Sequence, residues 1–575
     1  MKLENYKYGS NFGRSQKNIT WPLYGAGLVK LGKNGKPVVN TLREYKPNEL
    51  LIRHDAVGLC FTDVKEITYG DQHPRLIGRN LAKNPIIPGH EASMTVIAVG
   101  DNLKDEYKVG DRFVIQPDVW YGGKSIPYSF GMDGAYRQYG VIGKEILNGD
   151  EGNYLIPVPD TMSYAGAALT EPWACVEAAY RMTYRTEFGN GGIAWFLGSG
   201  NSRSGYCLRK ILNKEHKPAR IFVTDIPDYL IRNLRHLAEE MEIECVPLKK
   251  DAVVRAEVEF DDIVVLDGDA ADVDNASQKL ANGGILAILR ERPMSAPIKL
   301  DFGRIHYDHI LYVGTTGLNI DEAYQGTPVR SSLKLQGTTL IMGSGGPMGR
   351  MHLQRALESS QGPNVIVATD IDVKRLSNIE LSFRTLIDRN LKEMVIINPC
   401  DQYKKYQDLL SQIMNEGGFD DVEVMITDIE AIVNIAEFVS ERGMINLFAG
   451  LKRGTMASVD AWHIYGPRQI RYIGHSGSKL SDQIAIVDRF KNGELQPHRS
   501  MAALCGMNQI AEGINAMMNS IYQGKIVVYP MVPDFPLTGL AELKHLLPQV
   551  YDLLENGSSW TNEAEAMFLE SMLPD

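Results

Sequence analysis

The sequence has few cysteines, no close cysteine pair and no excess of positive charge. Its six cysteines, at positions 60, 175, 207, 245, 400 and 505, are scattered over 575 residues and form no CxxC motif. Such thiols suit a reducing compartment rather than a disulfide framework. Lysine and arginine number 60 against 71 acidic residues, so the net charge of −11 offers no attraction to a nucleic-acid backbone.

Long apolar runs are also missing. No run of about 18 apolar residues could span a bilayer, and the first residues lack the apolar core of a signal peptide. We therefore expect a cytoplasmic protein with neither a membrane nor a nucleic-acid partner. The chain does have length: 575 residues with 44% hydrophobic content suffice for several cores, and we expect three domains.

The chain shows two successive patterns of apolar residues. From about residue 20 to 160, short apolar runs such as "LLIRHDAVGLC" and "YLIPVP" are broken by Gly and Pro, which predicts a β-rich, barrel-like unit. From about 190, apolar strands alternate with helical segments, as in "GIAWFLGSG" followed by "GYCLRKILNK", which predicts a parallel sheet of βαβ units. The same pattern restarts at "TTLIMGSGG" and continues to about 490.

This second pattern is an internal repeat. Gly198 and Gly343 lie 145 positions apart, and so do the acids Asp225 and Asp370 that end the following strands. Further on, "FDDIVVL" matches "FDDVEVM" at an offset of 159, and "YVGTTG" matches "YIGHSG" at 160. Four matches in the same order indicate a duplicated domain.

The second glycine-rich turn, "IMGSGGPMGR", has the spacing of a dinucleotide-binding motif. An acid ends the next strand 27 residues after the first glycine. Glycines let a pyrophosphate approach the N-terminus of the following helix, and the acid bonds the ribose while repelling a 2′-phosphate. The pattern predicts an NAD(H) site formed by Gly343, Gly345, Gly346, Gly349 and Asp370.

The first turn, "FLGSGNSRSG", departs from this spacing. Arg203 stands where the third glycine belongs, and a glycine follows only at Gly205. Two interpretations are open. Gly198, Gly200, Gly205 and Asp225 could form a variant cofactor site in which Arg203 contacts a phosphate, or the copy could be degenerate and kept for architecture.

Three motifs upstream of the turns carry metal-binding side chains. "GLCFTDVKE" supplies Cys60, "IPGHEAS" supplies His90 and Glu91, and "LTEPWACVEAA" supplies Glu171. Thiolate, imidazole and carboxylate together suit tetrahedral zinc. Each residue alone is more often structural, but the cysteine motif and the His-Glu pair, about 30 residues apart and upstream of a nucleotide-binding turn, are a rarer combination.

On these motifs the chain resembles the zinc-containing medium-chain alcohol dehydrogenase superfamily, and most of all its polyol and sugar dehydrogenases of the sorbose-1-phosphate reductase-like branch. The resemblance includes "GSGGPMGRMHLQRALE" and the return segment "GKIVVYPMVPDFPLTGLAEL", but not the first nucleotide-type domain. It implies an α/β fold with a GroES-like catalytic domain over 1–188 and 500–575. Two doubly wound, Rossmann-type parallel-sheet domains are expected over 189–332 and 333–499, the second binding NAD(H).

The resemblance also implies one catalytic zinc ion, whose ligands would be Cys60, His90 and either Glu91 or Glu171. Thr62 would relay the alcohol proton, and Lys65 stands where related enzymes often have a histidine that passes it on. The loop "YIGHSGSK" (472–479) would border the nicotinamide. We expect no structural zinc, because 118–134 lacks the four cysteines of that lobe, and we expect a homo-oligomer.

The expected function is therefore hydride transfer between NAD(H) and a secondary alcohol or ketone of a polyol, sugar or sugar phosphate. Two alternatives remain at this point. One is a redox-neutral sugar epimerase or isomerase that uses bound NAD. The other is a non-enzymatic nucleotide sensor with a vestigial metal site.

Overall fold

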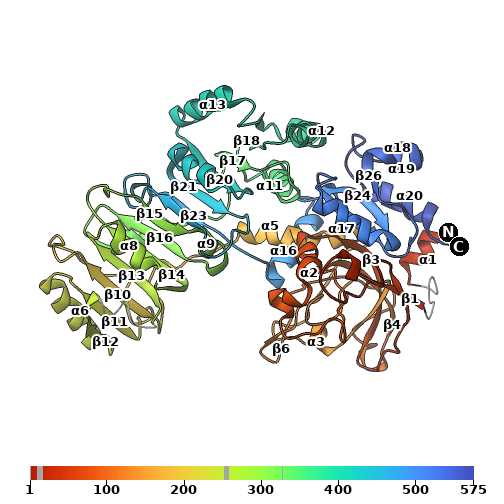
Figure 1. The fold of residues 1–575 in the computed structure, drawn as a ribbon, viewed down its shortest axis with the longest axis horizontal. Helices are drawn as coiled ribbons and strands as arrows, with labels where there is room; N and C mark the ends of the chain where they lie inside the picture. Colours follow the sequence, from red (N-terminus) through yellow and green to blue (C-terminus); the bar gives the residue numbers. More distant parts are fainter. Residues whose placement is uncertain (1, 10–16, 251–257, 327, 575) are drawn as a thin grey trace.

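The computed structural model describes residues 2–9, 17–250, 258–326 and 328–574. A β-rich unit and a first parallel-sheet unit (the first unit, 189–332) lie at opposite ends of the long axis, and a second parallel-sheet unit (the second unit, 333–499) lies between them (Figure 1). The predicted fold class, a β-rich domain with two parallel-sheet domains, is confirmed. No helix in the described part of the chain combines the length and apolarity needed to cross a membrane.

The β-rich unit contains an eight-stranded sheet whose central strand β3 is buried along its whole length. The return segment supplies three strands of this sheet, so the two ends of the chain form one body. The strands are β3 (Leu50–Gly58), β4 (Glu91–Val99), β5 (Arg112–Ile115), β8 (Tyr139–Ile142), β9 (Leu155–Pro157), β24 (Met501–Gly506), β25 (Lys525–Tyr529) and β26 (Thr538–Gly539). The helices beside it are α2 (Phe61–Tyr69), α5 (Thr170–Ala179) and α17 (Ile510–Met518).

Shorter elements complete this unit. A small hairpin, β6 with β7, lies within the 118–134 region discussed above. The elements are α1 (Lys2–Lys7), β1 (Lys17–Thr20), β2 (Val38–Thr41), β6 (Trp120–Tyr121), β7 (Lys124–Ser125), α3 (Lys144–Leu147), α4 (Tyr164–Ala168), α18 (Leu543–Leu546), α19 (Pro548–Tyr551) and α20 (Asn562–Met572).

The first unit is built on a six-stranded parallel sheet in the order β12-β11-β10-β13-β14-β16. Its strands are β10 (Ile193–Gly198), β11 (Arg220–Thr224), β12 (Glu244–Pro247), β13 (Phe260–Leu266), β14 (Leu280–Leu289) and β16 (Leu311–Thr315), with β15 (Ile298–Asp301) outside the sheet. Its helices are α6 (Asp228–Met241), α8 (Ala270–Ser277), α9 (Phe302–Asp308) and α10 (Ile320–Gln325).

The second unit repeats this order as β19-β18-β17-β20-β21-β23, the order of a doubly wound nucleotide-binding sheet. Its strands are β17 (Thr338–Met342), β18 (Val365–Thr369), β19 (Glu393–Ile397), β20 (Phe419–Val424), β21 (Val439–Leu447) and β23 (Arg471–Ile473), with β22 (Met456–Val459) outside. Its helices are α11 (Pro347–Glu358), α12 (Val373–Asn390), α13 (Tyr403–Asn415), α14 (Ile429–Asn434), α15 (Trp462–Tyr465) and α16 (Leu480–Lys491).

Details below the level of strand order also repeat. β13 and β20 each carry a register shift next to their first residue. In each copy of the repeat, an arginine a few residues before the first strand pairs with a buried aspartate in the shifted strand: Arg185, ahead of β10, with Asp262 at 3.0 Å, and Arg330, ahead of β17, with Asp421 at 2.5 Å. These matched ion pairs support the duplication inferred from the sequence.

One prediction about the first unit is wrong. The helix expected after its glycine turn, in "GYCLRKILNK", does not form, and 201–219 contains no helix at all. The Asp321 carboxylate accepts the backbone N–H groups of Arg209, Lys210 and Ile211 at 3.0 to 3.2 Å, and Cys207 forms an isolated bridge with Asn319. These contacts satisfy backbone donors that a helix would otherwise use, so the segment stays irregular.

Candidate active site and cofactor site

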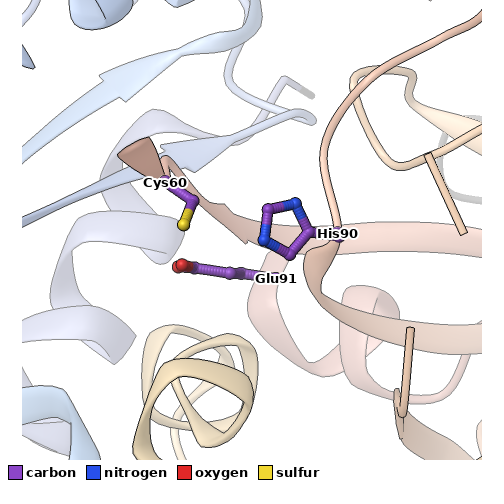
Figure 2. A group of neighbouring side chains, drawn as sticks. All are labelled: Cys60, His90 and Glu91. Carbon is purple, nitrogen blue, oxygen red and sulfur yellow. The ribbon is translucent and has the colours of Figure 1, made fainter. Parts of the chain in front are cut away.

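Three buried or half-buried side chains meet where β3 gives way to α2 and where β4 begins. Cys60 caps the N-terminus of α2, and His90 and Glu91 stand at the start of β4. The Cys60 Sγ, one ring nitrogen of His90 and one Glu91 oxygen all lie within 4.8 Å of one another (Figure 2). The structure therefore brings together three of the four predicted ligands in a group that could hold a metal ion.

Asp63, on the first turn of α2, orients two of these groups. Its Oδ2 accepts the Cys60 backbone N–H at 2.9 Å and the Tyr136 hydroxyl at 2.7 Å, and its Oδ1 lies 3.0 Å from His90 Nδ1. Burial alone would raise the pKa of Asp63, but His90 and these hydrogen bonds lower it by a larger amount. The net shift is downward, so the group stays a carboxylate. An ionised Asp63 accepts a hydrogen bond from His90 Nδ1–H, which keeps the ring proton on Nδ1 and leaves Nε2 free to bind a metal.

Glu91 forms an ion pair with a lysine of the return segment. Lys525 Nζ donates to Glu91 Oε1 at 2.5 Å, and both side chains are almost completely buried. The other oxygen, Oε2, is buried without a hydrogen bond in the described part of the chain. A Cβ atom at Gly58 would lie 2.0 Å from this oxygen, so a larger residue there would displace the Glu91 carboxylate. A buried oxygen without a hydrogen bond, next to a thiol and an imidazole, fits the donor set of a cation site.

Glu171, at the start of α5, is buried close to this group without belonging to it. Its Oε1 lies 3.9 Å from the Cys175 thiol. Burial raises the pKa of Glu171 to about 7, with His90 opposing the shift and Glu91 adding to it. Of the two candidate carboxylates, Glu91 is the one that the structure places beside both Cys60 and His90.

The two predicted proton-transfer residues lie on α2 and not at its buried face. Thr62 is half-exposed two positions after Cys60, and Lys65 is exposed about one turn further on. The Lys65 ammonium lies 5.8 Å from the centre of the Phe61 ring.

The second glycine turn has the geometry of an anion site. Gly343 adopts a φ of +78°, and a Cβ at Gly349 would lie 2.2 Å from the Gly343 oxygen, so both positions require glycine. Gly346 caps α11 directly, and nothing lies within 3.9 Å of its Cβ position. The N-terminus of α11 is therefore open to a ligand, and unpaired N–H groups there favour a phosphate.

Asp370 is fixed at the end of β18. It is buried, its Oδ2 accepts the Gly345 N–H at 3.0 Å, and its Oδ1 accepts the Asp372 N–H at 3.0 Å. A carboxylate has about four acceptor positions, so two remain for the hydroxyl groups of a ribose. A Cβ at Gly345 would meet this carboxylate at 2.8 Å.

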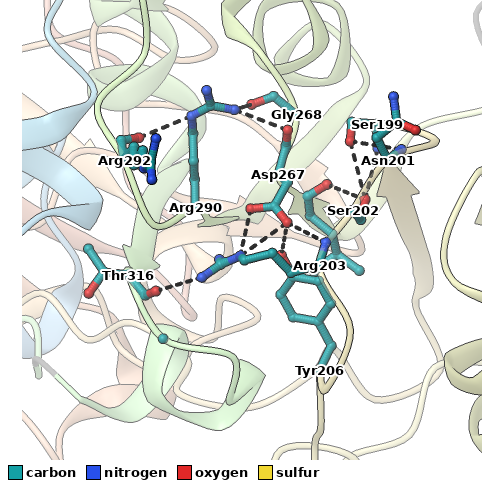
Figure 3. Close-up of polar contacts among 12 residues, drawn as sticks. Ser199, Asn201, Ser202, Arg203, Tyr206, Asp267, Gly268, Arg290, Arg292 and Thr316 are labelled. Atoms are coloured by element: carbon teal, nitrogen blue, oxygen red, sulfur yellow. Dashed lines mark hydrogen bonds and ion pairs between the residues drawn. The ribbon is translucent and has the colours of Figure 1, made fainter.

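Side chains in and just after the first glycine turn bond to residues that follow β13 and β16. The Arg203 backbone N–H and Nε donate to Asp267 at 2.7 and 3.0 Å, and the Tyr206 hydroxyl donates to the same carboxylate at 2.6 Å (Figure 3). Arg203 also reaches the Thr316 oxygen at 3.2 Å. Asp225, in contrast to Asp370, is exposed and has a φ of +50°. Without a following helix, this arrangement favours a degenerate copy over a phosphate site.

The backbone of the first turn differs from that of the second. Gly200 and Gly205 have φ values of +76° and +99°, whereas in the second turn the positive φ falls on Gly343. A Cβ at Gly198 would lie 2.2 Å from the Asp225 oxygen, so the start of the first turn still requires a glycine.

The sequence alone did not assign Asp63, Tyr136 or Lys525 to the site. Asp63 had a signal, since an acid three residues after a helix N-cap is the capping-box position. Lys525 had a weaker one, a lysine that opens an otherwise apolar strand in "GKIVVYP". Tyr136 is placed by tertiary structure and had no local signal.

Comparisons with known proteins agree with this architecture. Residues 46–148 match the family model of the alcohol dehydrogenase GroES-like domain. A mannitol-1-phosphate 5-dehydrogenase of Aliivibrio fischeri is 27% identical over 337 residues, which cover 54% of this chain and 78% of that protein. The L-sorbose 1-phosphate reductase of Klebsiella pneumoniae is 26% identical over 238 residues, covering 41% and 56% respectively.

A solved structure is similar over almost the whole chain. The 2R,3R-butanediol dehydrogenase of Bacillus subtilis superposes with a TM-score of 0.50 at 14% identity, covering 89% of this chain and 99% of that one. The matched domain and the sugar-phosphate dehydrogenase relatives support an oxidoreductase of the alcohol dehydrogenase type. Together with the fold, they support the medium-chain alcohol/polyol dehydrogenase superfamily as the family of this chain.

Proposed function

We propose that this chain is a zinc-dependent dehydrogenase that transfers a hydride between NAD(H) and a secondary alcohol or ketone of a polyol, sugar or sugar phosphate. The single observation that carries the proposal is the buried Cys60, His90 and Glu91 group, with His90 turned by Asp63 so that Nε2 is available. The names of the sugar-phosphate relatives support the substrate class.

Cys60, His90 and Glu91 would hold the zinc ion, with Glu171 close enough to take part through a water molecule. When bound, zinc polarises a substrate oxygen as a Lewis acid, and nicotinamide accepts or donates the hydride. Asp63 keeps the imidazole in the metal-binding tautomer, and Lys525 neutralises the Glu91 carboxylate from the side away from solvent.

We assign Thr62 to receive the proton of the substrate hydroxyl and Lys65 to pass it towards solvent, because Thr62 is half-exposed two positions after Cys60 and Lys65 is exposed further along the same helix. Glu171, with its pKa raised to about 7, can hold or release a proton near neutrality.

The cofactor would occupy the second unit. Its phosphates would face the N-terminus of α11 at Gly346, and its ribose would bond to Asp370, which opposes a 2′-phosphate. The helix α5 connects this site to the metal-binding group: Glu171 starts it, and Glu177 near its end pairs with Arg355 of α11 at 3.0 Å.

The other proposals rest on weaker support. A division at 188, 332 and 499, a cytoplasmic location and a homo-oligomeric state remain predictions from the sequence and the resemblance. The epimerase alternative depended on two working nucleotide domains, and the first turn, bonded as described to Asp267, gives it no support.

The proposal is tested by metal content and turnover together. The purified chain should contain about one zinc ion, and a screen of polyols and sugar phosphates should change NADH absorbance. Cys60→Ala should lose most of the metal and the turnover while leaving the fold largely intact. Cys400→Ala, which removes an exposed thiol in the second unit, is the matched control and should change neither. Full turnover by Cys60→Ala, or two tightly bound zinc ions, would refute the proposal.

A further inference from the structure

The first and second units pack through equivalent elements. β15 pairs antiparallel with β22, with Ile298 opposite Val459 and Asp301 opposite Met456. These two strands have the same place in their units: each follows the fifth strand of its sheet and precedes the short helix that leads to the sixth. In addition, α9 of the first unit contacts β23, and α15 of the second contacts β16. Equivalent surfaces that contact each other in both directions form an isologous contact, as in a twofold dimer.

This contact is a shared core. Buried side chains of both units belong to one apolar cluster, which includes Leu300 and Phe302 of the first unit and Val459 and Tyr472 of the second. The Phe302 and Tyr472 rings lie 5.6 Å apart. Such a continuous core is typical of obligate subunit interfaces, which resemble a domain core cut in half.

Each unit also covers the open edge of the other sheet. β16 and β23 are the terminal strands of their sheets on this side, and they contact each other. An uncovered terminal strand is prone to pair with a second chain. Here the cover for each edge comes from the same polypeptide.

The first unit reaches the cofactor side of the second. His309, which follows α9, places Nδ1 3.3 Å from the Gly474 oxygen, and its ring stacks on Tyr184 at 4.2 Å. The Tyr184 hydroxyl also accepts the Gly474 N–H at 3.3 Å. Gly474 begins the loop that follows β23, and further along this loop Ser478 is bonded by Gln116 at 3.0 Å.

The loop from Gly474 to Ser478 thus lies between two groups. His309 of the first unit and Tyr184 contact it on one side, and Gln116 at the end of β5 contacts it on the other. The loop follows the last strand of the second sheet, at the carboxyl ends of the strands, where open α/β sheets bind their ligands. A residue of the first unit therefore positions a loop of the second unit's cofactor cleft.

We infer that the first unit is a built-in replacement for a second subunit. It covers the edge of the cofactor-binding sheet through a pseudo-twofold contact and fixes the Gly474–Ser478 loop, and it binds no dinucleotide of its own. The inference rests on the proposed function, because it takes the second unit as the NAD(H) site.

Titration calorimetry of the full chain with NADH tests whether the first unit binds a dinucleotide. Wild type and Asp225→Ala should each bind one NADH per chain, and Gly346→Val should bind none. Two sites in wild type, or one site that is lost in Asp225→Ala and kept in Gly346→Val, would overturn the inference and leave the proposed chemistry standing. No binding to the folded wild type would refute the proposed function itself.

The contact between His309 and the Gly474 loop is tested by His309→Ala. His236→Ala is the matched control, because His236 is an exposed histidine on α6 of the same unit. His309→Ala should weaken NADH binding about fivefold, the effect of one neutral hydrogen bond, at an unchanged thermal midpoint. His309→Gln should recover most of the affinity because it restores a donor, and His236→Ala should behave as wild type. Wild-type NADH affinity in His309→Ala would overturn the inference.

Discussion

Asp63→Asn is the sharpest test of how the metal-binding group is oriented. The Asp63 carboxylate accepts from three donors: at Oδ2 the Cys60 N–H at 2.9 Å and the Tyr136 hydroxyl at 2.7 Å, and at Oδ1 the His90 Nδ1 group at 3.0 Å. An amide has one acceptor oxygen and one donor nitrogen, so it cannot satisfy both sides.

The two orientations of the new amide fail for different reasons. With its oxygen towards Cys60, its NH₂ group faces His90 Nδ1, which must then be the acceptor and leave the ring proton on Nε2. An imidazole protonated at Nε2 cannot bind a metal through that atom. With its oxygen towards His90, the NH₂ group faces the Cys60 N–H and leaves that buried donor without a partner.

The expected cost is a loss of zinc affinity of about 10- to 100-fold, the usual effect of removing a partner that orients a ligand, which corresponds to about 1.4 to 2.7 kcal/mol. The assay is competition between the protein and a zinc chelator with a spectroscopic signal. Turnover should be measured with zinc at saturation as well, to separate metal loading from chemistry.

Glu66→Gln is the matched control, since Glu66 is buried on the same helix and neither of its oxygens is hydrogen-bonded in the described part of the chain. Burial raises the pKa of Glu66 well above its ordinary value, which favours the neutral acid, and replacement by a neutral amide should leave zinc affinity unchanged. Zinc binding by Asp63→Asn as tight as that of wild type would show that Asp63 does not set the tautomer of His90.

Three further predictions concern the second unit. Gly346→Val should fold normally, because nothing lies within 3.9 Å of the Cβ position, yet lose NADH binding in a fluorescence titration; retained binding would place the phosphates elsewhere. Asp370→Ser should narrow the preference for NAD(H) over NADP(H) in steady-state kinetics, and a wild type that prefers NADP(H) would contradict the role of Asp370. Burial raises the pKa of Glu423 from 4.5 to about 8. The unfolded chain then releases this proton first as pH rises, and the free energy of unfolding should fall by about 3 kcal/mol between pH 4.5 and 7. Glu423→Gln should remove most of this pH-dependent fall in the free energy of unfolding, measured by urea unfolding at a series of pH values. An unchanged pH dependence in the variant would assign the fall to other groups.

The duplication and the two parallel sheets could be predicted because they depend on local patterns. Glycine turns and strand-end acids repeat at an offset of 145, later strands repeat at 159 to 160, and the structure gives both sheets the same strand order. The same reasoning failed at "GYCLRKILNK", where Asp321, more than a hundred residues away along the chain, takes the backbone N–H groups that a helix would have used. A long-range side chain overrode a local preference there.

The candidate site shows the same division. Cys60, His90 and Glu91 lie in two short motifs at the ends of neighbouring strands, so their chemistry was readable before their positions were known. Lys525 lies 434 positions from Glu91 and becomes its partner only because β25 joins β3 in one sheet. A contact made by sheet topology leaves no trace in the spacing of a motif.

The antiparallel pairing of β15 with β22 affects how the stability of the protein depends on its concentration. In a dimer, a contact of this kind dissociates as the protein concentration falls, and stability then depends on how much protein is present. In this chain both strands belong to one polypeptide, so their effective concentration is set by the connection between them and not by the solution. The cover over the second sheet therefore persists however few copies of the protein a cell contains.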